Sequence, residues 1–117
     1  MRICHIGLNY KTAPVELRER LAVPEADIHD ILQEKISRPP IREAALLSTC
    51  NRVEMTLVTH DPDAAIAIAH EWFAKKAGLP LSDVIEHLYA HTTDASIRHL
   101  YAVASGLDSL VLGEPQI

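Results

Sequence analysis

Apolar and polar positions alternate along parts of the chain in the manner of β-strands. Residues 2–9 follow this pattern crudely and are rich in strand-forming side chains, which predicts a first strand. Two further apolar segments, 43–47 and 53–59, are separated by the polar sequence Ser-Thr-Cys-Asn-Arg at 48–52, which has the length of a hairpin connection. The pattern therefore predicts two more strands joined by a polar corner.

Helical spacing is found between the first and second of these strands. A short helix is predicted at 15–21, and Pro24 begins a longer one that has acidic residues in its first turn. The Pro39-Pro40 pair ends that helix, because proline cannot continue the hydrogen-bond ladder. The apolar positions of the longer helix recur at helical spacing and are Ile28, Ile31, Leu32 and Ile36.

The segment after the third strand predicts a further helix at 62–77. Asp61 before Pro62 is typical of a helix start, and Gly78 is typical of a helix end. A short helix at 82–86 then leads into a brief strand at 87–91, and Thr92 or Thr93 can cap a last helix that ends at 105–106. The side chains expected to be buried are Ile66, Ala69 and Phe73 in the first of these helices and Ile97, Leu100, Tyr101 and Ala104 in the last.

This order of elements, β-α-β-β-α-β followed by a helix, indicates an α+β fold. It matches a ferredoxin-like sandwich with additional helices, in which helices cover one face of an antiparallel sheet. Residues 108–117 mix polar and apolar positions without a polar tail. We therefore expect residues 1–117 to be one domain of a longer chain.

Composition excludes several classes of protein. The chain has 117 residues, 48% of them hydrophobic and 23% charged, which is the balance of one soluble globular domain. Neither a membrane-spanning run of about 20 apolar residues nor a secretory signal is visible, so we expect a cytoplasmic protein without membrane contact. The net charge of -5 argues against a protein that holds nucleic acid mainly by neutralising phosphates, so any such contact must be local.

The two cysteines, Cys4 and Cys50, are far apart and are expected to be free thiols, because their spacing fits neither a redox motif nor a zinc site. Cys4 falls in a predicted strand, where a small buried side chain is the better interpretation. Cys50 lies in the polar corner, where the positive charge of Arg52 would favour the nucleophilic thiolate. The alternative is a purely structural turn, in which Arg52 pairs with Glu54 or another carboxylate.

Other polar residues support weaker hypotheses. His87 and His91 have the i, i+4 spacing of a metal pair, but no set of tetrahedral ligands accompanies them. His99 could project into a cleft or be a half-buried residue bonded to backbone, and Glu114 and Gln116 could present hydrogen-bond partners or form an ordinary turn. No glycine-rich loop for a nucleotide phosphate is present, so a redox cofactor would have to bind elsewhere.

Three segments taken together resemble the N-terminal catalytic domain of the glutamyl-tRNA reductase family. They are Gly-Leu-Asn-Tyr-Lys-Thr-Ala-Pro at 7–14, Ser-Thr-Cys-Asn-Arg-Val-Glu at 48–54, and the stretch 102–117, which contains Ser-Gly-Leu-Asp-Ser-Leu-Val-Leu-Gly-Glu-Pro-Gln-Ile. The resemblance extends in order over essentially the whole chain. Tyr10 stands where the family often has histidine, and Thr56 where it often has an aromatic residue.

The resemblance implies an NADPH-dependent oxidoreductase that reduces glutamyl-tRNA to glutamate-1-semialdehyde, the first step of five-carbon tetrapyrrole and heme biosynthesis. Cys50 would attack the aminoacyl ester and hold glutamate as a thioester. The chain would contact the acceptor end of the tRNA. The NADPH-binding and dimerisation domains would lie outside it, the latter making the full-length protein a homodimer. The alternative is a ferredoxin-like ligand-binding or regulatory module without catalysis.

The resemblance also implies roles for individual residues. Cys50 would be the catalytic nucleophile, and His99 would assist the reaction or line the pocket. Arg52 would bind the side-chain carboxylate of the glutamyl group. The remaining residues of the implied glutamyl pocket are Thr49, Asn51, Ser109, Glu114, Pro115 and Gln116.

Overall fold

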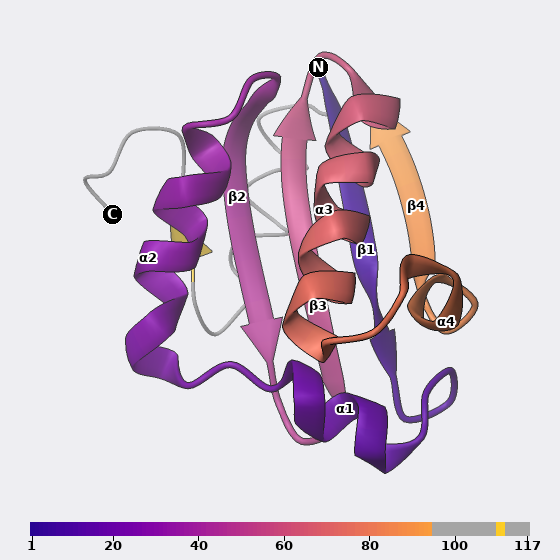
Figure 1. Ribbon diagram of the computed structural model, residues 1–117. Helices are drawn as coiled ribbons and strands as arrows, with labels where there is room; N and C mark the ends of the chain where they lie inside the picture. The colour runs from indigo at the N-terminus through magenta and orange to yellow at the C-terminus, as the bar shows by residue number, and fades with distance from the viewer. Residues whose placement is uncertain (95–109, 112–117) are drawn as a thin grey trace.

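The computed structural model describes residues 1–94 and 110–111 of the chain. Strands and helices follow one another in an order that begins and ends with strands (Figure 1). The elements are β1 (Arg2–Asn9), α1 (Val15–Leu21), α2 (Glu25–Ile36), β2 (Ile41–Ser48), β3 (Arg52–Thr59), α3 (Pro62–Ala77), α4 (Leu81–Ile85), β4 (Tyr89–Asp94) and β5 (Leu110–Val111).

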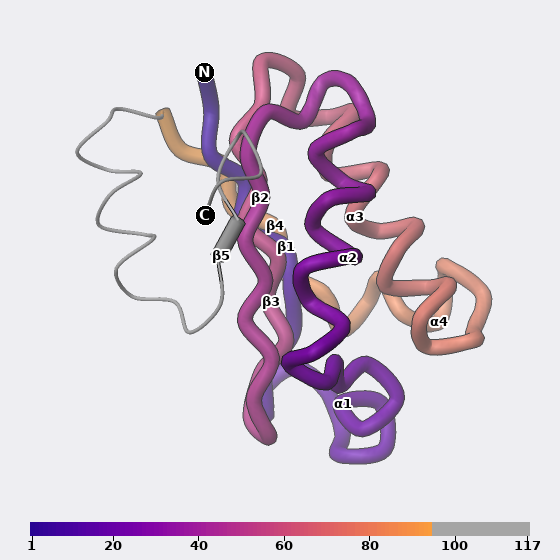
Figure 2. Tube along the Cα trace, turned by 90° about the vertical axis from the view of Figure 1, so that its left-hand side faces the viewer, coloured from indigo at the N-terminus to yellow at the C-terminus, as the bar shows by residue number. Residues whose placement is uncertain are grey.

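The strands form one sheet in the order β4-β1-β3-β2-β5. Every pairing between neighbours is antiparallel, and β1 and β3 pair along their whole length. The described helices all lie on one face of this sheet, as the two views at right angles show (Figures 1 and 2). The predicted α+β class and the antiparallel sheet are thus confirmed, and the described helices cover one face of the sheet as expected.

The hydrophobic core lies between the sheet and the helices. Because successive side chains of a strand point to opposite faces, alternate residues of each strand enter this core. Phe73 of α3 is fully buried against them. The strand residues that face the helices are Cys4, Ile6, Leu8, Ile41, Ala44, Leu46, Val53, Met55 and Leu57.

Local signals set the ends of α3 at the predicted residues. The Asp61 side chain accepts a hydrogen bond from the Ala64 amide at 3.3 Å, which caps the first turn. Gly78 adopts a left-handed conformation with φ of 71°, which ends the helix. Ala69 and Phe73 are buried as predicted, whereas Ile66 is only partly buried.

The prediction for residues 82–91 was wrong in its boundaries. The short helix is α4, one residue earlier than expected, and the strand begins at Tyr89 instead of His87. His87 stays in the turn because its amide donates to the Val84 carbonyl at 2.9 Å and its ring nitrogen bonds the Thr12 carbonyl at 2.9 Å. The predicted last helix lies outside the described residues.

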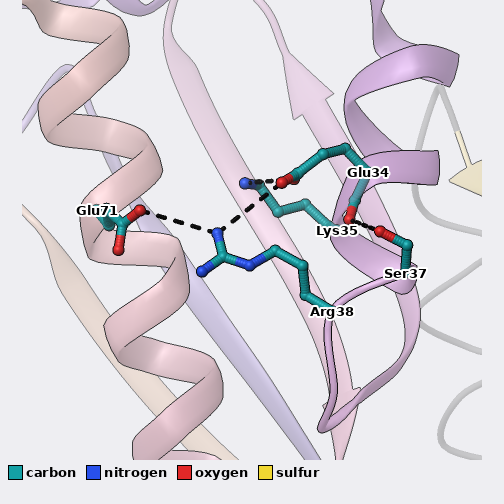
Figure 3. A network of polar contacts seen from close by, with 5 residues as sticks. All are labelled: Glu34, Lys35, Ser37, Arg38 and Glu71. Carbon is teal, nitrogen blue, oxygen red and sulfur yellow. Dashed lines mark hydrogen bonds and ion pairs between the residues drawn. The ribbon is translucent and has the colours of Figure 1, made fainter.

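A polar cluster joins the end of α2 to α3, at the end of the sheet opposite to the β2–β3 hairpin (Figures 1 and 3). Arg38 lies 3.9 Å from Glu34 and 3.8 Å from Glu71, and the buried Lys35 lies 2.7 Å from Glu34. Such partly exposed pairs contribute about 0–1 kcal/mol each. The cluster therefore connects α2 to α3 and adds little to the stability of the fold.

None of the helices in the described part of the chain combines the length and hydrophobicity needed to cross a bilayer.

Candidate functional site

The β2–β3 hairpin presents Cys50 at its tip. The Thr49 amide donates to the Arg52 carbonyl at 2.8 Å, which closes the turn. The Thr49 hydroxyl accepts hydrogen bonds from the amides of Asn51 and Arg52, each at 3.2 Å. The amides of Thr49, Asn51 and Arg52 are therefore satisfied within the turn, and the exposed Cys50 lies between them.

Two residues that precede β2 in the chain, Arg18 and Val23, form hydrogen bonds with this hairpin. The Arg18 guanidinium of α1 donates to the Cys50 carbonyl through Nη1 at 2.8 Å. The Val23 amide donates to the Ser48 hydroxyl at 3.0 Å. The hairpin is thus tied to α1 and to the segment that follows it.

The two cysteines lie in opposite environments. Cys4 is fully buried, with Sγ 3.8 Å from the Thr92 hydroxyl, and burial raises the pKa of its thiol. Cys50 is exposed and forms no disulfide. Cys50 is therefore the accessible thiol of the two, and both cysteines are free as predicted.

Arg52 begins β3 and shares a strand face with Glu54 and Thr56, the face opposite to the described helices. Its guanidinium makes no hydrogen bond or ion pair with any residue among 1–94. The structural alternative, in which Arg52 pairs with Glu54, is not observed. The guanidinium is available to bind a ligand near the hairpin tip.

Glu54 instead belongs to a polar row that crosses three strands. Its carboxylate accepts a hydrogen bond from the Tyr89 hydroxyl of β4 at 2.7 Å and lies 3.8 Å from His5. Gly7 of β1 pairs with both Glu54 and Tyr89, so the Tyr89 side chain spans the position where Gly7 has no side chain. The His5 ring also lies 3.1 Å from the Thr56 hydroxyl.

The hydrophobic pattern of the sequence does not predict this row, although one signal of it is present. A glycine inside a predicted strand indicates a close approach of backbone or side chain, and Gly7 is such a glycine.

Replacing Tyr89 by phenylalanine tests the row. Burial, followed by the hydrogen bond to Glu54, raises the pKa of the Tyr89 phenol. The neutral phenol is therefore favoured by folding, and this stabilisation is lost as pH rises above about 10 towards the higher folded pKa. We expect Tyr89→Phe to lower the free energy of unfolding by about 1–2 kcal/mol at pH 7.

Urea titrations of both proteins measure this difference in the free energy of unfolding, which should disappear at high pH. If the free energies of unfolding of the wild type and of Tyr89→Phe differed by the same amount at every pH up to 11, the pairing of Tyr89 with Glu54 would be contradicted.

The predicted site residues form two groups, one in the hairpin and one outside the described part of the chain. Thr49, Cys50, Asn51 and Arg52 come together in the hairpin. The residues that lie outside the described part are His99, Ser109 (which directly precedes β5), Glu114, Pro115 and Gln116.

The metal hypothesis finds no ligand set in the described part of the chain. Residues 1–94 contain no group of three or more histidine, cysteine or acidic side chains that could hold a metal ion. His87 binds the Thr12 carbonyl, and the His91 ring stacks on Tyr89 with centroids 5.5 Å apart.

Comparison with known proteins identifies the family of this hairpin-bearing domain. A family model described as the glutamyl-tRNA(Glu) reductase N-terminal domain matches residues 6–117. The chain belongs to the glutamyl-tRNA reductase N-terminal domain family. Glutamyl-tRNA reductases of Synechococcus sp. (strain JA-3-3Ab) and Magnetococcus marinus (strain ATCC BAA-1437 / JCM 17883 / MC-1) are each 44% identical to it over 117 residues, its full length.

The chain spans 27% and 28%, respectively, of the lengths of these two relatives. A solved structure of glutamyl-tRNA reductase from Methanopyrus kandleri is similar to this fold, with a TM-score of 0.52 and 24% sequence identity. That likeness covers 97% of this chain and 25% of the other. The fold and the family are therefore shown for this domain alone.

The described residues do not form a Rossmann-type site for a nicotinamide dinucleotide. That type of site consists of a strand, a glycine-rich loop and a helix that follow one another beside a parallel strand. The described glycines do not form that loop, because Gly7 lies inside β1 and Gly78 ends α3. All strand pairings in the described sheet are antiparallel.

Proposed function

We propose that this chain is the catalytic domain of a glutamyl-tRNA reductase and that Cys50 accepts the glutamyl group. The Cys50 thiolate attacks the ester carbonyl carbon of glutamyl-tRNA and forms a tetrahedral intermediate. As it collapses, the carbon–sulfur bond is retained, the bond to the ribose oxygen breaks, and that oxygen takes a proton. The observation that carries this proposal is the exposed thiol at the tip of a tied hairpin, in a chain of this family.

Arg52 is the proposed partner of the side-chain carboxylate of the glutamyl group. Its planar guanidinium can form two parallel hydrogen bonds to a carboxylate. It is two residues from Cys50 and is not engaged by any carboxylate in residues 1–94. The rest of the pocket is proposed from the family resemblance, with Thr49 and Asn51 joined by His99, Ser109, Glu114, Pro115 and Gln116.

The later stages of the reaction are proposed for parts of the protein outside this chain. Reduction to glutamate-1-semialdehyde needs a hydride donor, which we propose is NADPH bound by a separate domain. Assembly into a homodimer is likewise proposed for another domain, and the cytoplasm is the proposed location. The strand order β4-β1-β3-β2, with helices after β1 and β3, supports a ferredoxin-like assignment for this domain.

The test is to look for the covalent intermediate. The chain is mixed with glutamyl-tRNA, quenched in acid, which preserves thioesters, and weighed by intact-protein mass spectrometry. We expect a glutamyl adduct on Cys50, and none with aspartyl-tRNA, whose shorter side chain places its carboxylate nearer the ester. No adduct, with glutamyl-tRNA deacylated no faster than in buffer, would contradict the proposal and favour a binding module without catalysis.

Arg18 is expected to position the nucleophile, since its guanidinium binds the Cys50 carbonyl. Arg18→Met removes this hydrogen bond, and we expect the rate constant of Cys50 acylation to fall about 10-fold, with a loss of about 1 kcal/mol in unfolding free energy. Arg18→Lys retains a donor and should recover part of the rate. The measurement is single-turnover acylation at saturating glutamyl-tRNA, which separates the rate constant from binding.

The role assigned to Arg18 would be wrong if both variants bound substrate more weakly but acylated at the normal rate once saturated.

A further inference from the structure

An aromatic ring is exposed on the loop between β1 and α1. Among the described phenylalanine, tryptophan and tyrosine residues, Tyr10 is the exposed one, with 58% of its area accessible. Lys11 follows it, and its ammonium lies 5.8 Å from the centre of the Tyr10 ring. The loop therefore presents a flat π-surface and a positive charge together, in a domain whose net charge is -5.

The backbone that carries this ring is fixed by hydrogen bonds. The Asn9 side chain accepts from the amides of Lys11 at 2.9 Å and Thr12 at 3.2 Å, and the Asn9 carbonyl accepts from the amides of Thr12 and Ala13. The Thr12 carbonyl is bound in turn by the His87 ring. Because the backbone is already ordered, a ligand that stacks on the ring restricts only the Tyr10 side chain, which favours binding.

The loop also lies at the same end of the sheet as the hairpin that carries the proposed nucleophile. Asn9 is the last residue of β1 and pairs with Arg52, the first residue of β3. Tyr10 comes one residue after Asn9, and Cys50 comes two residues before Arg52, so the Cα atoms of Tyr10 and Cys50 are separated by at most about 17 Å. The two side chains can therefore approach the same end of one ligand.

We propose that Tyr10 and Lys11 form a subsite for the 3′-terminal nucleotide of the aminoacylated tRNA, in which the terminal base stacks on the Tyr10 ring and Lys11 pairs with a phosphate. This inference rests on the proposed function, because the glutamyl ester attacked by Cys50 is carried by the ribose of that nucleotide. Stacking of a base on an aromatic ring is tolerant of base identity and is a common way to hold single-stranded ends.

The geometry also accounts for how an acidic domain can bind the tRNA end. Phosphate neutralisation along a helix needs many cations, whereas one ring and one ammonium suffice for a single nucleotide. The subsite would place the ester without contacts to the rest of the tRNA.

The test compares two esters of glutamate that differ in the leaving alcohol. One is the 2′(3′)-glutamyl ester of adenosine 5′-monophosphate, and the other is glutamate α-methyl ester, which has no base or phosphate. We expect Tyr10→Ala to raise KM for the nucleotide ester about 10- to 100-fold and to leave the cleavage of the methyl ester unchanged. Tyr10→Phe should stay within about 3-fold of wild type for both, since stacking needs the ring and not the hydroxyl.

Two further variants sharpen the test. Lys11→Gln should raise KM for the nucleotide ester a few-fold, by a factor that shrinks as salt increases. Ile85→Ala, a matched truncation of a side chain that is 41% exposed on α4, should change neither ester.

Equal KM values for Tyr10→Ala and wild type on the nucleotide ester, or an equal loss on both esters, would overturn the subsite. Cleavage of both esters that persists in Cys50→Ala, or cleavage of neither by wild type, would instead refute the proposed function itself.

Discussion

Replacing Cys50 by serine is expected to abolish the glutamyl adduct and to lower the rate of glutamyl-tRNA deacylation by at least about 10³-fold. Serine has nearly the shape of cysteine, so the hairpin held by Thr49 and Arg18 should persist. A serine hydroxyl is a poor nucleophile at neutral pH without an adjacent base, whereas a cysteine provides a fraction of thiolate unaided. The measurement is acid-quenched intact mass together with the release of free glutamate.

The matched control is the other cysteine. Cys4 is fully buried on the helix-facing side of β1, and its raised pKa keeps the thiol neutral. Cys4→Ala should therefore leave acylation unchanged at temperatures where the variant is folded. Iodoacetamide should likewise modify Cys50 rapidly and Cys4 only after unfolding.

An adduct that survives in Cys50→Ser but disappears in Cys4→Ala would show that Cys4, and not Cys50, accepts the glutamyl group. Equal deacylation by all three proteins would mean that the hairpin is an ordinary turn.

Elements whose ends depend on local chemistry could be predicted from the sequence. The bounds of α3 were predicted at Pro62 and Ala77 because the Asp61 cap and the left-handed Gly78 act within one turn. The polar corner around Cys50 was found for a similar reason, since it interrupts two apolar strands. In both cases the residues that decide the structure are neighbours in the chain.

Features that depend on distant contacts could not be predicted in this way. The start of β4 was misplaced because the His87 ring binds a carbonyl 75 residues away. Arg18 supports the hairpin across 32 residues, and Tyr89 meets Glu54 across 35 residues. A hydrophobic pattern records which face of a strand is buried, but it does not specify which polar groups meet after folding.

Replacing Gly7 by alanine is expected to lower the free energy of unfolding by about 3 kcal/mol. A Cβ atom at this position would lie 2.4 Å from the Val53 carbonyl oxygen and 2.8 Å from the Glu54 Cα atom. Both are backbone atoms of β3, so they cannot rotate away as a flexible side chain would. The β1–β3 pairing must therefore move, and it runs along the full length of both strands.

The same substitution should also weaken the proposed reaction. Gly7 lies between Glu54 and Tyr89, and Arg52 is two residues before Glu54 on the same strand. A displaced β3 carries Arg52 and the hairpin tip with it, and displacement by about 1 Å near a reacting centre can cost roughly 10²-fold in rate. We expect acylation of Cys50 to fall with Gly7→Ala even at temperatures where the variant remains folded.

Gly78→Ala provides the matched control, because it adds the same methyl group at a position where the expected destabilisation has a different cause. Gly78 has φ of 71° and no atom within 4 Å of the position of a Cβ, so alanine there meets conformational strain of about 1–2 kcal/mol but no clash. Urea titrations should give the larger loss for Gly7→Ala, and only that variant should slow acylation. Equal losses in the two variants would show that β1 and β3 can separate at Gly7 at little cost, and that the close approach of these strands does not hold Arg52 and Cys50 in place.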